Sequence, residues 1–158
     1  MRLTDYLPHW APNIHPLVVH FPIALLLTAA GLDVAALALR GSRSLRLAAT
    51  TAYVVGTVAL VGTYFSGRAA AQTIWMPGMA QAMAGDHWTW ALRTVWFFCA
   101  LTTIRLALFV RREPRPMVVL ALVLAGLVGV VRVGETADRG GRLVYQFGVG
   151  TAPSDPRD

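Results

Sequence analysis

Apolar residues along this chain are gathered into four long runs, and the short stretches between them hold many of the charged residues. The runs cover about residues 17–39, 47–66, 88–110 and 117–134. Each approaches or exceeds the roughly 20 residues that a helix needs to cross a bilayer. The pattern therefore predicts an all-α integral membrane protein, a four-transmembrane-helix bundle that forms one membrane domain over residues 1–158.

The segments outside these runs are too polar or too interrupted to span. Residues 67–87 contain Pro77 and several glycines, which favours an interfacial helix or a re-entrant loop. Residues 135–158 are expected to form an outer C-terminal segment. Within the first run, Pro22 lacks a backbone N–H group, so a kink is predicted near His20.

Composition supports this architecture, because the chain is 56% hydrophobic and only 14% charged. Its net charge of +6 comes from arginine, since the chain has no lysine. Arginines cluster in the first and third links, at positions Arg40, Arg43, Arg46, Arg111, Arg112 and Arg115. The positive-inside rule then predicts that these links lie in the cytoplasm and both termini outside, which in a bacterial inner membrane is the periplasm. Lipids are the expected contact, and nucleic acid is not an expected partner.

Two opposite charges lie inside the apolar runs at similar depth. Asp33 precedes Arg40 by seven residues, and Arg105 precedes Arg111 by six, in runs that point the same way. An ionisable side chain in a membrane is costly unless it is paired. We therefore expect a buried Asp33–Arg105 ion pair, with a structural role rather than a role in proton transfer, because one isolated pair makes no relay.

Three histidines are expected to gather near the outer face. His15 and His20 begin the first run, and His87 begins the third. They could be hydrogen-bonded interfacial side chains, or they could be ligands, since imidazoles on facing helices hold metals and haem in bundles. His15 and His20 are five residues apart, about 140° around an ideal helix, so they do not readily face one metal. His20 and His87 are therefore the predicted metal ligands, and His15 is expected to bond a propionate or a backbone group.

The cofactor that these ligands predict is haem b. Arg93 and Arg132 lie near the same outer level and could neutralise its propionates. Arginines near helix ends also simply extend their charged groups into the interface, and that alternative stays open.

Copper(I) is a second possible ligand of this region. Met76, Met79, Met83 and His87 follow one another at helical spacing, which would line one face with soft donors, with Met79, Met83 and His87 as the metal-binding set. Methionines at this spacing are also typical of an ordinary apolar face.

Three motifs resemble a bacterial family of small four-helix predicted membrane proteins of unknown function. They are the string IHPLVVHFPIALLL at residues 14–27, the histidine at the head of the third run, and GGRLVYQFGVG at residues 140–150. The resemblance covers most of the chain and implies the four-helix architecture. In that family the closing motif commonly carries a histidine where this chain has Phe147, so any ligand there is missing here.

Together these features predict a b-type cytochrome-like electron-transfer protein with haem near the periplasmic face. Its partner would be a larger membrane complex or a periplasmic redox protein. The alternative is a non-catalytic accessory subunit of a respiratory or photosynthetic complex. Either role is expected in preference to a stand-alone enzyme, because no catalytic motif is present.

Overall fold

Five helices make up the chain in the computed structural model, which describes residues 13–39, 42–74, 76, 78–109 and 115–151. They are α1 (His15–Val18), α2 (His20–Ala38), α3 (Arg43–Ala71), α4 (Gly78–Phe109) and α5 (Pro116–Tyr145). Because α1 and α2 together form one span, four helical segments are long and apolar enough to cross a membrane. The predicted fold class is confirmed.

The break between α1 and α2 falls at Val19. Pro22 has no N–H group to donate to the carbonyl of Val18, so one helical hydrogen bond is missing here. Next to this break the ring of His20 donates from Nδ1 to the carbonyl of Pro16 at 3.2 Å. Chain direction is otherwise maintained, because Val19 has helical dihedral angles of φ −61° and ψ −32°.

The helices continue beyond the apolar runs. α3 extends to Ala71, α4 begins at Gly78, and α5 extends to Tyr145. Residues 78–87, expected in an interfacial loop, are thus the first turns of α4, and residues 135–145 belong to α5. Alanines at positions 69–71 and at 80, 82 and 84 favour helix beyond the apolar runs of α3 and α4. At 32 residues, α4 is about 48 Å long, well beyond the roughly 30 Å hydrocarbon core.

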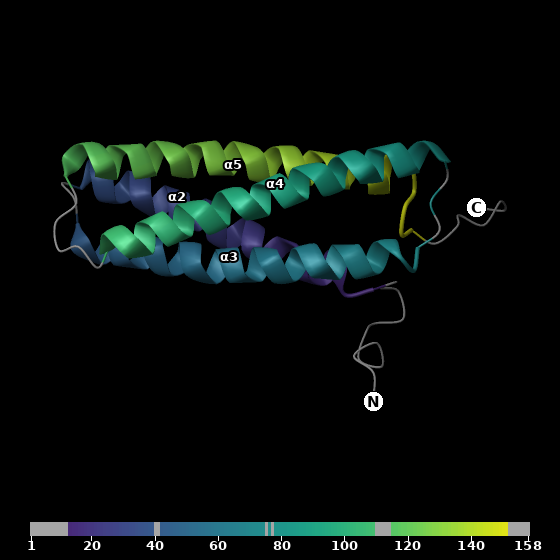
Figure 1. Cartoon of the computed structure of the whole chain (residues 1–158), viewed down its shortest axis with the longest axis horizontal. Helices are drawn as coiled ribbons and strands as arrows, with labels where there is room; N and C mark the ends of the chain where they lie inside the picture. Colours follow the sequence, from purple (N-terminus) through teal and green to yellow (C-terminus); the bar gives the residue numbers. More distant parts are fainter. Residues whose placement is uncertain (1–12, 40–41, 75, 77, 110–114, 152–158) are drawn as a thin grey trace, which may run out of the picture.

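The four long helices form a closed ring. Each packs against its two neighbours, in the order α2, α3, α4, α5 and back to α2. Their shared core includes one large side chain from each helix, namely Leu26, Tyr53, Phe98 and Val133. In Figure 1 the α2–α3 and α4–α5 links lie at one end, and the α3–α4 link and both termini lie at the other.

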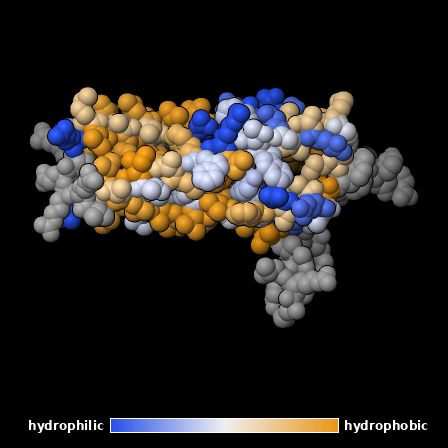
Figure 2. All heavy atoms as spheres, viewed as in Figure 1, coloured by the Kyte–Doolittle hydropathy of each residue, from blue (hydrophilic) through white to orange (hydrophobic). Residues whose placement is uncertain are grey.

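We call the end with the α2–α3 and α4–α5 links the arginine end, because α3 begins there with Arg43 and α5 follows Arg115. The other is the histidine end, defined by His15 and His87. Figure 2 shows apolar side chains covering much of the half toward the arginine end, whereas hydrophilic side chains gather toward the histidine end. Arg40, Arg111 and Arg112, used above for orientation, lie outside the described residues.

Asp33 and Arg105 meet across the ring and join α2 to α4. Arg105 donates from both terminal nitrogens, Nη1 to Oδ2 and Nη2 to Oδ1, each at 2.7 Å. The side chains are only 4% and 6% exposed. The predicted ion pair is confirmed. Both residues lie four or five positions from the arginine end of their helices.

The other two opposite helices, α3 and α5, meet beside this ion pair. Tyr53 of α3 is fully buried, and its ring lies 4.5 Å beneath the guanidinium of Arg105. Its hydroxyl packs on Gly126 of α5, so closely that a Cβ atom at position 126 would overlap it. Glycine is therefore required at 126 so that all four helices can meet around the ion pair.

We expect Asp33→Leu to lower the free energy of unfolding by about 1–3 kcal/mol, because the change leaves the Arg105 guanidinium buried without its counter-ion. Asp33→Leu with Arg105→Leu should be less destabilising than Asp33→Leu alone. Unfolding in mixed detergent micelles measures both, with Val34→Leu at the neighbouring exposed position as control. Equal losses in the single and double variants would contradict a coupled pair.

Gly126→Ala should lower stability by about 1–3 kcal/mol, because the added methyl group must displace the Tyr53 hydroxyl from a packed core. Gly134→Ala is the matched control on the same helix, since a Cβ atom there meets nothing within 4 Å. Thermal unfolding in detergent compares the two. A Gly126→Ala variant as stable as Gly134→Ala would show that the contact imposes no constraint.

Candidate functional site

His15 begins the first span and is oriented by α3. Its backbone N–H donates to Oδ1 of Asn13 at 3.0 Å, and its ring Nδ1 lies 3.0 Å from Oγ of Ser66. The Ser66 hydroxyl donates its single proton to the carbonyl of Thr63 at 2.8 Å. Ser66 Oγ must therefore accept from His15 Nδ1–H, which leaves Nε2 of His15 with a free lone pair.

His87 lies in α4 and is oriented by α5. Its Nδ1 is 3.1 Å from the carbonyl oxygen of Thr136. A carbonyl can only accept, so Nδ1 carries the proton and Nε2 again keeps its lone pair. Thr136 is held in turn, because its hydroxyl donates to the carbonyl of Arg132 at 2.8 Å and accepts from Thr94 at 2.9 Å.

Both imidazoles pack against glycines on the neighbouring helix. A Cβ atom at Gly67 of α3 would lie 2.9 Å from Cε1 of His15, and one at Gly140 of α5 would lie 3.2 Å from Cε1 of His87. These distances leave little or no room for a side chain. Glycine at each position lets a ring lie between two helices, half-buried, rather than pointing outward.

The two rings belong to helices at opposite corners of the bundle. His15 is 23 residues from the end of α2 at Ala38, and His87 is 22 residues from the end of α4 at Phe109. These separations correspond to about 34 and 33 Å of helix, so the rings lie at the same level.

His20 does not join this pair. Its side chain is exposed, and its Nδ1 is held by the carbonyl of Pro16 one turn earlier in the same span. The five-residue spacing explains the difference, because only one of His15 and His20 can face the interior of a helical bundle. The structure therefore turns His15 and His87 toward neighbouring helices at one level of the bundle and leaves His20, predicted as a ligand with His87, exposed.

The two arginines expected beside a cofactor have different surroundings. Arg93 is exposed on α4. Arg132 is half-buried on α5, with its guanidinium 5.2 Å from the ring centre of Phe97. Both lie about a turn or more from the histidines toward the arginine end.

The methionine set falls partly on α4. Met79, Met83 and His87 are spaced four residues apart within this helix and so share a face. Met79 is 76% exposed, Met83 is half-buried, and Met76 precedes the helix. Among the described residues, no group of three or more His, Cys, Asp or Glu side chains is arranged to hold a metal ion.

The residues that orient the histidines were not predicted from the sequence. These are Ser66, Thr136, Gly67, Gly140 and the polar cluster around Arg139. Ser66 and Gly67 end the second apolar run, and Thr136 and Gly140 follow the fourth, at the level where the histidines begin theirs. The sequence feature that could have identified these residues is the presence of hydroxyl-bearing and glycine residues at the same depth as the histidines.

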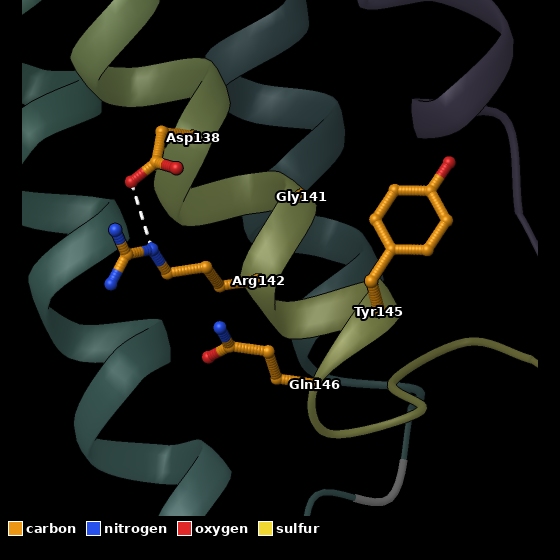
Figure 3. Close-up of a pocket in the computed structure, with 5 residues that line it drawn as sticks. All are labelled: Asp138, Gly141, Arg142, Tyr145 and Gln146. Atoms are coloured by element: carbon orange, nitrogen blue, oxygen red, sulfur yellow. Dashed lines mark ion pairs between the residues drawn. The ribbon is translucent and has the colours of Figure 1, made fainter.

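A surface pocket lies further along α5 and is separate from the histidine pair. Asp138, Gly141, Arg142, Tyr145 and Gln146 line it, and Figure 3 shows the Arg142–Asp138 ion pair on one side of α5 and Tyr145 pointing to another. Tyr145 is 90% exposed. This hollow follows one helix at the surface and gathers no buried polar group, so the histidine pair remains the candidate site.

A family model described as "Predicted membrane protein (DUF2231)" matches residues 11–153. The chain belongs to this family. The match includes the described helices and both histidines of the pair, and it confirms the resemblance to a predicted membrane protein family of unknown function. No curated protein and no solved structure matches the chain.

Proposed function

We propose that this DUF2231 protein is a membrane electron-transfer protein that holds haem b at the histidine end through His15 and His87. The observation that carries the proposal is that two half-buried rings at one level of the bundle are each oriented by a neighbouring helix, whereas His20 is exposed and held by its own span. Each uses Nδ1–H in a hydrogen bond and keeps Nε2 free. A histidine that binds a metal typically donates one ring N–H to a neighbouring group and coordinates through the other nitrogen, so these two rings would be suited to hold haem iron.

The residues present fit such a cofactor in their chemistry. Ser66 and the Thr136 carbonyl would serve as the outer partners that fix ligand orientation and increase ligand basicity. Arg132 and Arg93 would be the candidates for pairing with propionates. Bound haem would supply one-electron chemistry between a quinol or another membrane donor and an acceptor on the same side of the membrane.

His20 has a different role in this proposal. An exposed ring held by its own span is suited to the membrane interface, where a polar tip meets lipid headgroups. The proposed axial pair is therefore His15 and His87, and His20 becomes the matched control for both.

The visible spectrum of the full chain, purified from haem-replete cells with and without dithionite, tests this function. We expect a six-coordinate low-spin haem. His15→Ala and His87→Ala should each lower haem content about tenfold or more, since each removes an axial ligand. His20→Ala should retain the wild-type spectrum. A colourless wild-type protein, together with normal yields of all three variants, would favour the accessory-subunit role instead.

The proposed orientation places the arginine end in the cytoplasm and the histidine end in the periplasm of a bacterial inner membrane. It follows from the arginines of the first and third links. Alkaline phosphatase fused after Asp158 should be active and a fluorescent reporter at the same position dark. A fusion after Ser42, in the first link, should give the opposite pattern. Cytoplasmic activity of the Asp158 fusion would reverse the orientation.

A further inference from the structure

Arg139 of α5 reaches across to α4 next to His87. Its Nε donates to Oδ2 of Asp86 at 2.7 Å. Its Nη1 donates to Oε2 of Glu135 at 2.7 Å and to the Glu135 carbonyl at 2.8 Å. The guanidinium also stacks over the ring of Trp90, 4.3 Å from the ring centre. One side chain thus joins two carboxylates and an indole from two helices.

The partners of Arg139 adjoin the atoms that orient His87. Asp86 immediately precedes His87 on α4, and Glu135 immediately precedes Thr136 on α5. The Asp86–Arg139–Glu135 bridge therefore runs beside the hydrogen bond from His87 Nδ1 to the Thr136 carbonyl. Gly140, which follows Arg139, faces the His87 ring. A rotation or slide of α4 against α5 that broke the bridge would also move the ring from its acceptor.

An exposed ion pair by itself contributes little, because water screens it and two long side chains must be ordered. Arg139 differs in geometry, since its planar guanidinium is held by several groups at once and is only 19% exposed. Arg142 provides the contrast. It pairs with Asp138 at 2.9 Å within α5, and both side chains are about half exposed. Arg142 makes no such bridge to α4 among the described residues, so it cannot set the register of the two helices.

We infer that Arg139 is a positioning residue for His87. By holding Asp86 against α5, it keeps His87 Nδ1–H on the Thr136 carbonyl and so leaves Nε2 as the ligand atom. The identity of what Nε2 binds rests on the proposed function. The orientation and tautomer of the His87 ring do not depend on that function, and they can be measured without any cofactor.

The test measures the imidazole nitrogens of His87 by ¹⁵N NMR, using the full-length protein in detergent, without haem and with haem added. In the wild type we expect a single tautomer with a protonated Nδ1 and a bare Nε2. Arg139→Gln should give a mixture of tautomers, whereas Arg142→Gln should match the wild type. Arg139→Lys, which can still pair with Asp86, should restore most of the wild-type signal.

Haem titration gives the second measurement. Arg139→Gln should weaken haem binding about tenfold, the effect typical of losing an outer-shell partner, and should shift the midpoint potential. Arg142→Gln should leave both unchanged. Asp86→Asn removes the same bridge from the α4 side and should reproduce the effect of Arg139→Gln, so the test does not depend on one variant folding.

Two outcomes separate this inference from the proposed function. If Arg139→Gln and Asp86→Asn lower the thermal midpoint but leave the His87 tautomer unchanged, the bridge only stabilises helix packing and the inference is overturned. If the wild type binds no haem while its His87 tautomer still depends on Arg139, the haem proposal fails and the positioning role stands.

Discussion

The buried pair of Asp33 and Arg105 is the constraint on which the rest of the bundle depends. Two opposite charges in an apolar interior cannot separate without leaving each uncompensated, so they keep α2 and α4 in one register. Tyr53 and Gly126 close the other diagonal beside the pair, which extends the constraint to α3 and α5. Since helices are stiff rods, a register fixed near one end also determines which residues meet at the other.

At the far end, that register brings His15 level with His87. About 27 Å of helix separates this level from the ion pair, and the intervening core includes Leu26, Phe98 and Val133. The two polar centres therefore have different surroundings. The ion pair is enclosed by all four helices, whereas the histidines are half-buried where the helices extend beyond the apolar layer. The histidines are therefore the more accessible of the two centres.

The two centres also differ in how their polar atoms are used. Arg105 directs both terminal nitrogens to Asp33, while its Nε and the adjacent Tyr53 hydroxyl are buried without a hydrogen-bond partner among the described residues. Each histidine instead has one nitrogen engaged by a neighbouring helix and one free. Partial burial and orientation by a neighbouring helix distinguish these two rings from His20, whose side chain is exposed and bonds within its own span. Arg139 adds a second link on the α5 side of the same site.

Periodicity and composition determined a large part of this fold. Apolar runs specify membrane spans because the hydrocarbon layer requires about 20 apolar residues in succession. Counting from the arginine-rich links placed Asp33 and Arg105 at one depth, since rise per residue is the same in parallel helices. Sequence alone also put His15, His20 and His87 near one level.

The tertiary structure decided which side chains face one another, which depth along the helices does not determine. Depth along a helix follows from counting, but the direction a side chain faces depends on how each helix is rotated in the bundle. That rotation turned His15 inward against Ser66 and left His20 exposed. It also selected Thr136 and Arg139, which lie some 50 residues from His87 in the chain, as partners of the His87 region. Helix ends depended on propensity rather than hydropathy, so α4 begins at Gly78, before its apolar run.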